Sequence, residues 1–406
     1  MSQPLSERGK RVQAVVLSGG GASGAYEVGV IKALATRSEP PFDPEVFAGT
    51  SIGSFNAAFL ASQWDRYGSA AARNLETLWR QRLANRPGPF GANGLYRLRG
   101  NPLDLLNLAG YLPNPLRPFW RLAGDGWFFF REAVRRVSSL PTLEGALLQR
   151  SANLLDLSAA LALEPWVETI HSLDFAAIRN SRRRLCIAAT NFESGKLRTF
   201  RNFEMTEELG PLAIRASSAI PGVLPAVPID VQKHVDGGVV MNTPLTLGLQ
   251  AGADELHVIY LDPKIEAIPT TSLDSTLDST YRNQVIGWSK LINMDIDAAR
   301  RINSALQALA RLRADPRARA VDLDRLAREL HVEHFKPAVI HRYHPHEDLA
   351  GGALGLLNFS PDHVGKLIDR GYEDALRHDC EESECVQLEA AAAESVTQRE
   401  TRRAAG

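Results

Sequence analysis

One serine of this 406-residue chain has the neighbours of a catalytic nucleophile. Residues 49–53 read Gly-Thr-Ser-Ile-Gly and fit the pattern G-x-S-x-G. Between a strand and a helix, this pattern forms a nucleophile elbow, a tight and strained turn that exposes the serine hydroxyl. The pattern requires glycine at positions 49 and 53, because we expect that side chains there would collide with the strand and the helix. Ser51 is therefore the candidate nucleophile, and the simpler alternative is a strand-to-helix turn with a serine N-cap.

A reacting serine also needs hydrogen-bond donors for the oxyanion that forms on the carbonyl it attacks. Residues 19–24, Gly-Gly-Gly-Ala-Ser-Gly, follow an apolar stretch and supply closely spaced backbone amides. A helix beginning at about Gly24 would add the positive end of its dipole. Gly19, Gly21 and Gly24 also fit the dinucleotide-binding pattern G-x-G-x-x-G, with Glu45 where a ribose-binding acid would stand. That alternative leaves the serine motif unexplained.

Asp236 is one candidate for the base that accepts the serine proton. It is followed by Gly237 and Gly238, and a turn without side chains can approach the serine closely. A free aspartate has a pKa near ~3.9 and is a weak base at neutral pH unless burial raises that value. From the residues alone, an Asp-Gly turn without a catalytic part explains the segment better.

Histidine is the other candidate base, as in α/β-hydrolases, where the order along the chain is Ser, Asp, His. His341, His344 and His346 lie late enough in the chain to fit this order. Their segment, residues 341–348, is polar and contains a proline, so we expect an exposed loop. A serine as early as residue 51 also comes too soon for that fold.

The elements around these motifs indicate a parallel sheet covered by helices. Residues 12–18 are short and β-branched and read as a buried strand, and residues 24–36 have helical spacing. A second strand and the start of a second helix follow at 45–51 and 54–62. Strand, glycine turn and helix thus occur twice, which is typical of an α/β fold.

Further elements follow after residue 180. Residues 182–200 resemble two strands joined by a Ser-Gly turn, and 253–263 form another buried strand. Residues 296–330 are expected to be helical with an interruption at Pro316, and 360–377 form a packed helix with a serine N-cap.

An insertion at about residues 86–150 breaks the alternation of strands and helices. Residues 94–136 combine seven arginines with a group of aromatic side chains: Tyr96, Tyr111, Phe119, Trp120, Trp127, Phe128, Phe129 and Phe130. Such a segment suits a cap that meets acyl chains or an anionic membrane surface. The alternative, equally weighted, is that these aromatics pack onto a core of their own.

Three blocks in this order resemble the signature of the patatin-like phospholipase family: residues 18–30, 49–57 and 235–244. Residues 216–227 and 358–375 also resemble segments of that family, so the similarity covers roughly residues 10–375. The resemblance implies a three-layer α/β/α sandwich around a mostly parallel sheet. It also implies hydrolysis by a serine–aspartate dyad without histidine.

The resemblance assigns roles to residues of the motifs. Ser51 would be the nucleophile and Asp236 the base, and the oxyanion hole would be formed by the amides around Gly19, Gly20, Gly21 and Ala22. Gly24, Gly49, Gly53, Gly237 and Gly238 would support these motifs. The family often has a basic residue where Ser23 stands, so any charge from that side chain is missing here.

Bulk properties exclude several classes of partner. The net charge is −1, which indicates no polyanion and hence no nucleic acid. The first twelve residues are polar and no run of eighteen apolar residues occurs, so we expect a cytoplasmic protein, with peripheral membrane contact at most. Cys186, Cys380 and Cys385 cannot build a disulfide framework and show no zinc-ligand spacing with histidine, so no metal and no organic cofactor are expected.

These observations predict a serine acyl hydrolase that cleaves carboxylic esters of phospholipids or lysophospholipids. Its domain would span residues 10–375, followed by a tail, residues 380–406, that is a frayed helix or disordered. One alternative is a lipid-binding or scaffold protein of the same fold that has lost turnover. Another is an acyltransferase, in which an alcohol other than water attacks the acyl-enzyme.

Overall fold

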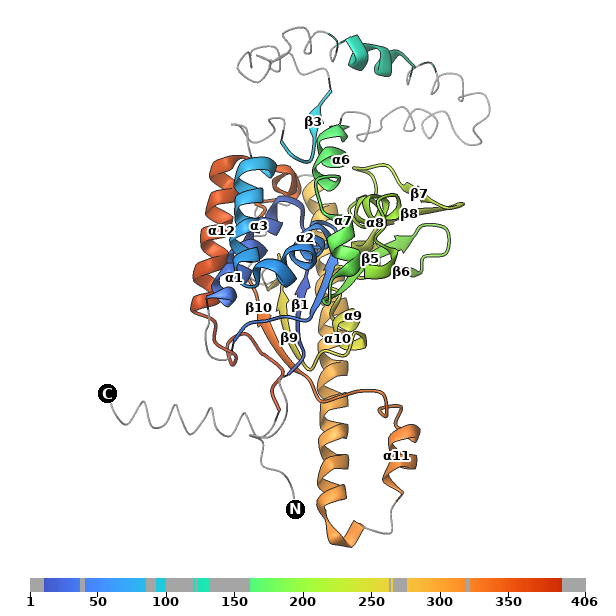
Figure 1. The fold of residues 1–406 in the computed structure, drawn as a ribbon, viewed down its shortest axis with the longest axis vertical. Coiled ribbons are helices and arrows are strands. Elements are labelled where there is room, and N and C mark those ends of the chain that lie inside the picture. Colours follow the sequence, from blue (N-terminus) through green and yellow to red (C-terminus); the bar gives the residue numbers. More distant parts are fainter. Residues whose placement is uncertain are drawn as a thin grey trace, which may run out of the picture.

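The structure is a computed structural model, and helices cover both faces of its central sheet (Figure 1). It describes residues 11–36, 41–84, 93–99, 123–131, 161–262, 264–265, 276–318 and 322–388, together with Trp120 and Val134. In the described residues, eight strands form the main sheet: β1 (Gln13–Leu17), β2 (Val46–Thr50), β5 (Arg184–Asn191), β6 (Leu197–Arg201), β7 (Val227–Ile229), β8 (Gln232–Asp236), β9 (Glu255–Ile259) and β10 (Val339–Tyr343).

The sheet is parallel over most of its width. Its order is β10-β9-β1-β2-β5-β8-β7, with β6 paired to β5 outside this path. The five strands from β10 to β5 run parallel, whereas β8, β7 and β6 pair antiparallel. Every residue of β1, β2 and β9 is buried, as expected for strands covered on both faces.

Two helical layers bury opposite sides of these strands. The helices are α1 (Gly24–Ala35), α2 (Ile52–Tyr67), α3 (Ala70–Leu78), α6 (Glu164–Ile170), α7 (Phe175–Asn180), α8 (Leu209–Ser217), α9 (Leu245–Gln250), α10 (Thr276–Ala314), α11 (Leu323–Glu329) and α12 (Pro361–Leu376). Val15 and Leu17 of β1 belong to one core with α1, α2, α3, α8 and α12. Ala14 and Val16 belong to a second core with α9 and α10. The expected three-layer α/β/α sandwich is confirmed.

Helix α10 begins at Thr276, whereas the sequence predicted a helix from about residue 296. Ile292 and Ile296, at helical spacing, pack into the core on the α9 side of the sheet, and this packing holds the first half of the helix. The helix ends at Ala314, just before the expected interruption at Pro316. None of the described helices combines the length and the apolar character needed to cross a bilayer.

The described part of the insertion forms a small unit outside the main sheet. Strand β3 (Arg97–Leu98) pairs antiparallel with β4 (Leu161–Ala162), and residues 123–131 are helical. Both terminal nitrogens of Arg97 donate to the carboxylate of Asp125, at 2.7 and 2.9 Å, which joins that helix to β3. The rest of the expected cap, including Tyr111 and Phe119, lies outside the described residues.

The C-terminal part differs from the sequence prediction in two places. The segment expected to be an exposed loop begins with the last three residues of strand β10, in which His341 is half-buried and Tyr343 is buried. Polar composition was misleading because β10 is an edge strand, one side of which is covered by the end of the chain. Val386 exchanges two backbone hydrogen bonds of 2.9 Å with Ile340, so the first residues of the expected tail are folded against the sheet. Residues 389–406 lie outside the described residues.

Candidate active site

The register of three neighbouring strands brings Ser51 and Asp236 to the same level of the sheet. Thr50, the last residue of β2, is the partner of Ala188 on β5. The next residue of β5, Ala189, is the partner of Asp236 on β8. Because β8 runs antiparallel, its last residue reaches the edge at which β2 ends and Ser51 follows.

Ser51 stands on a strained turn between β2 and α2. Its backbone angles are φ 54° and ψ −126°, a region that residues other than glycine rarely adopt. A Cβ on Gly49 would lie 2.2 Å from the Gly53 carbonyl oxygen, and one on Gly53 would lie 2.6 Å from the Leu17 carbonyl oxygen. Backbone contact therefore requires glycine on both sides of the serine, and the turn has the form of a nucleophile elbow.

Ser217, at the end of α8, holds this turn in place. Its Oγ accepts a hydrogen bond of 2.9 Å from the Ser51 amide and donates one of 2.6 Å to the Ala188 carbonyl. Ser217 is fully buried, so water cannot replace these bonds. Ser217 lies in residues 216–227, a segment that resembles the family, but the resemblance assigned no role to this side chain.

We expect Ser217→Ala to lower kcat about 10- to 100-fold while KM changes little, because the Ser51 amide loses its acceptor and the nucleophile moves. Steady-state kinetics on a soluble ester would measure both values. Ser172→Ala is the matched control, since within the described part of the chain that hydroxyl bonds only to the Thr169 carbonyl in its own turn. An unchanged kcat in Ser217→Ala would contradict this positioning role.

The carboxyl group of Asp236 is buried beside the serine. Burial raises its pKa to about 7, although the Ser51 hydroxyl and the Gly238 amide act to lower it. Oδ1 accepts a hydrogen bond of 2.7 Å from the Gly238 amide. Oδ2 has no partner at full hydrogen-bond geometry among the described residues, so the contact with Ser51 is looser than a regular hydrogen bond. Loose contacts of this kind are common in catalytic pairs without substrate.

The glycine-rich loop after β1 lies against the serine. A Cβ on Gly19 would come within 3.0 Å of Ser51 Cβ. The Gly19 amide, however, donates to the Asn242 carbonyl at 3.1 Å and is therefore not free for an oxyanion. The amides of Gly20, Gly21 and Ala22 have no hydrogen-bond acceptor among the described residues. Three of the four predicted amides thus remain available.

Two further residues hold the glycine-rich loop and the Asp-Gly-Gly turn in place by hydrogen bonds to their carbonyl groups. The side-chain amide of Asn242 donates to the Gly19 carbonyl at 3.2 Å. Trp288 of α10 donates from its indole nitrogen to the Gly238 carbonyl at 2.6 Å. Asn242 belongs to the third sequence block, but the role of Trp288 depends on the packing of α10 and has no local signal.

The structure argues against the dinucleotide-binding alternative, because Glu45 does not lie near the glycine-rich loop. Glu45 precedes β2, at the opposite end of the strand from Ser51, and its amide donates to the Gln13 carbonyl. Its carboxylate faces Arg184 at 3.5 Å. Glu45 therefore lies away from the glycine-rich loop and cannot meet a ribose bound there.

The histidines proposed for a triad also lie away from Ser51. His341 is on β10, which is separated from β2 by β9 and β1. His344 follows β10 and stacks on Tyr260, with ring centroids 3.9 Å apart. Among the described residues, no histidine lines the pocket that contains Ser51.

That pocket is apolar and opens beside the serine. Its volume is about 50 Å³, and Ser51 and Gly21 are among the residues that line it. The walls are formed mainly by aliphatic and aromatic side chains: Ile52, Leu95, Tyr96, Leu161, Leu163, Trp166, Ile220, Val223, Leu224, Leu356, Leu357 and Phe359. Such a wall suits a hydrocarbon chain attached to the carbonyl that Ser51 would attack.

A buried serine on an elbow at the edge of a mostly parallel sheet is the arrangement of serine esterases. Comparison with known proteins specifies the family: the model of patatin-like phospholipases matches residues 15–249. The chain belongs to the patatin-like phospholipase family, a family of lipid ester hydrolases.

Two individual proteins share parts of this similarity. A lysophospholipase, nte1 of Aspergillus terreus, is 44% identical over 71 residues, which are 16% of this chain and 4% of that protein. The chain thus spans a small fraction of the length of this curated relative. VipD of Legionella pneumophila, a solved structure, aligns over 93% of this chain and 69% of its own with 15% identity and a TM-score of 0.35.

Proposed function

We propose that this protein is a serine acyl hydrolase that cleaves carboxylic esters of phospholipids or lysophospholipids through Ser51 and Asp236. The observation that carries the proposal is the pairing of the two side chains. The Ser51 hydroxyl lies close enough to the buried carboxyl of Asp236, whose pKa is about 7, to act on that pKa, and Oδ2 of this carboxyl has no hydrogen-bond partner among the described residues. A base with a pKa near the working pH is well matched to proton transfer.

The reaction would proceed in two halves. Ser51 Oγ attacks the ester carbonyl while Asp236 takes the hydroxyl proton, and the amides of Gly20, Gly21 and Ala22 stabilise the oxyanion. The intermediate collapses as the leaving alcohol takes the proton from Asp236. Water then attacks the acyl-enzyme and gives a proton to the same carboxylate. As this second intermediate collapses, Ser51 Oγ leaves and takes the proton back from Asp236, and a fatty acid is released.

The insertion is proposed to bring the protein to a lipid surface. Trp127 and Phe130 on the helical residues 123–131 stack at a centroid distance of 5.7 Å and are largely exposed. Arg99 lies over the Phe128 ring of the same helix, 4.0 Å from its centroid. Exposed aromatic rings beside arginine suit the interface of an anionic membrane. We propose that residues 10–375 form one hydrolase domain that carries this insertion.

The substrate class is tested by product analysis on a mixed lipid panel. We expect the wild-type protein to release free fatty acids from phospholipids or lysophospholipids, as detected by mass spectrometry. Val223→Phe fills the pocket beside Ser51 and should lower kcat/KM on long-chain esters about 10- to 100-fold, with a smaller effect on short soluble esters.

Val231→Phe is the matched control, because Val231 is 95% exposed on the β7–β8 turn and is not in the pocket wall. An equal loss on short and long esters in Val223→Phe would contradict acyl binding in this pocket. Absence of any released fatty acid from the panel would favour the scaffold alternative. Transfer of the acyl group to an added alcohol, in place of water, would favour the acyltransferase.

A further inference from the structure

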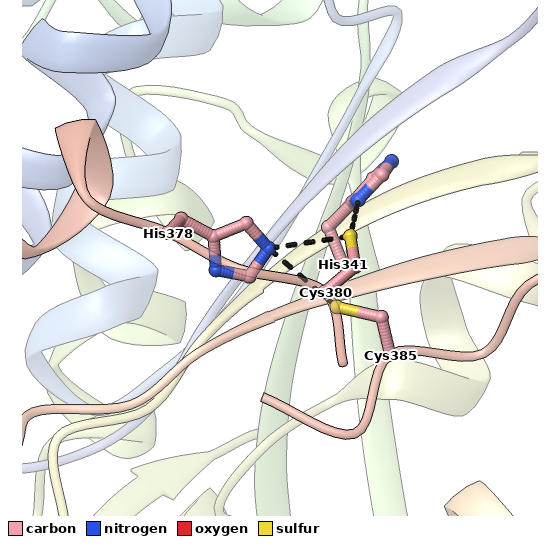
Figure 2. A group of neighbouring side chains, drawn as sticks. All are labelled: His341, His378, Cys380 and Cys385. Atoms are coloured by element: carbon pink, nitrogen blue, oxygen red, sulfur yellow. Dashed lines mark hydrogen bonds between the residues drawn. The ribbon is translucent and has the colours of Figure 1, made fainter. Parts of the chain in front are cut away.

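Four side chains with metal-binding atoms gather beside the edge strand β10 (Figure 2). His341 comes from β10, and His378, Cys380 and Cys385 come from the segment after α12. Their four ligand atoms all lie within 4.8 Å of one another. The sequence shows no zinc-ligand spacing between these cysteines and a histidine, but the fold brings His341 from a distant part of the chain to their side.

We propose that these four side chains bind a zinc ion that fixes the C-terminal segment to the sheet. Two thiolates and two imidazoles are a common tetrahedral ligand set for structural zinc. Zinc bond lengths of about 2.3 Å to sulfur and 2.0–2.1 Å to nitrogen place tetrahedral ligand atoms about 3.5 Å apart.

The distances between the ligand atoms fit this geometry. His341 Nδ1 lies 3.4 Å from Cys380 Sγ, and His378 Nε2 lies 3.6 Å from the same sulfur. His378 Nε2 also lies 3.5 Å from Cys385 Sγ. The two cysteines are free thiols, with no disulfide between them. One ion at the centre could therefore bind all four atoms with little movement of the side chains.

The second nitrogen of each imidazole faces a partner that would orient the ring. His341 Nε2 lies 3.6 Å from the carboxylate of Glu255 on β9. His378 Nδ1 lies 3.3 Å from Ser383 Oγ. Ligating histidines usually give their other N–H to a carboxylate or another acceptor, which fixes the tautomer. Both rings are thus arranged to present the required nitrogen to the metal.

Backbone contacts support the sulfur side of the site. Cys385 Sγ accepts a hydrogen bond of 3.2 Å from the Arg342 amide of β10. Next to Cys385, Val386 pairs with Ile340 of the same strand. The chain after α12 thus returns to β10, and a zinc ion would lock that return in place.

The site is distinct from the proposed active site in position and in chemistry. Four protein ligands leave no open position for water or substrate, which is typical of a structural zinc. None of the four residues lines the pocket that contains Ser51. Metal content can therefore be measured without any hydrolytic assay, and failure of the zinc proposal leaves the proposed function untouched.

Metal analysis of the full chain tests the proposal directly. Protein purified without a metal-affinity tag should contain about one zinc ion per chain. After removal by a chelator, added Co²⁺ should give the intense visible absorption of tetrahedral cobalt bound to thiolates. Chelation should also lower Tm and expose the segment after α12 to protease, because metal binding contributes to folding free energy.

Variants separate the ligands from other thiols. Cys380→Ser and His341→Ala should each lose most of the bound metal, whereas Cys186→Ser, which removes the third cysteine of the chain from buried β5, should retain it. If a ligand variant fails to fold, the metal content and the cobalt absorption of the wild-type chain still test whether the protein binds zinc. The proposal is overturned if the chain binds neither metal, or if Cys380 and Cys385 are found joined in a disulfide.

Discussion

Ser51→Ala is expected to abolish ester hydrolysis, with a loss in kcat of at least about 10⁴-fold. The hydroxyl is the proposed attacking atom, and no other serine can occupy the strained elbow. The fold should survive, since the Ser51 side chain makes only a loose contact with Asp236 and the Ser217 bond uses the backbone amide. Fatty acid release from a phospholipid, measured by mass spectrometry, gives the size of the effect.

Ser62→Ala is the matched control for this loss. Ser62 is a buried serine as well, but it lies within α2, and among the described residues its hydroxyl bonds only to the Phe59 carbonyl one turn earlier. We expect wild-type rates in this variant. Substantial hydrolysis by a correctly folded Ser51→Ala protein would contradict the assignment of the nucleophile.

Asp236→Asn should give the second largest effect, a loss in kcat of about 10²- to 10⁴-fold. The amide has the same shape and can still accept the hydrogen bond from the Gly238 amide, but it cannot take the serine proton. Burial raises the pKa of Asp236 to about 7, so wild-type kcat/KM should rise with pH through about 7 as the carboxylate forms. A pH profile of both proteins measures this rise, which the variant should lack.

Asp262→Asn is a close control for this effect. Burial raises the pKa of Asp262 to about 7 as well, but the Asp262 side chain lines a different cavity with Tyr260 and Lys264. The Asp262→Asn variant should therefore still show the rise of kcat/KM near pH 7. If Asp262→Asn removed the rise and Asp236→Asn did not, the base would be misassigned.

The same pKa has a consequence for stability. Folded Asp236 keeps its proton up to about pH 7, whereas the unfolded chain releases it near ~3.9. The contribution of Asp236 to the free energy of unfolding is thus fully present below about pH 4 and is lost as pH rises through about 7. Asp236→Asn, which stays neutral, should therefore raise Tm relative to wild type more at about pH 8.5 than at about pH 5.

Local sequence motifs were sufficient to predict the part of the fold that carries the proposed site. The apolar stretches before Gly19 and Gly49 become the adjacent parallel strands β1 and β2, and helices follow both turns. Local steric contacts explain why these two turns could be predicted. A side chain on Gly49 or Gly53 would collide with neighbouring backbone, so the turn requires glycine at both positions. Burial raises the pKa of Asp236 to about 7, whereas a free aspartate has a pKa near ~3.9 and is a weak base at neutral pH.

The features of the site that the sequence did not predict depend on contacts between residues far apart in the chain. Ser217 and Trp288 reach the site from α8 and α10, and the sequence assigned a role in the site to neither side chain. The Gly19 amide was expected in the oxyanion hole, but it donates to the carbonyl of Asn242, a residue 223 positions away in the chain. His341 of β10 was expected to be exposed because composition alone does not reveal that the end of the chain covers an edge strand.

Covalent labelling with a fluorophosphonate tests the central claim most directly, because it requires both the nucleophile and its base. We expect one adduct per chain, located on Ser51 by peptide mapping. Its rate of formation should rise with pH through about 7 in the wild-type protein and fall by orders of magnitude in Asp236→Asn. An adduct on another residue, or equally fast labelling when the carboxylate is gone, would contradict the Ser51–Asp236 dyad.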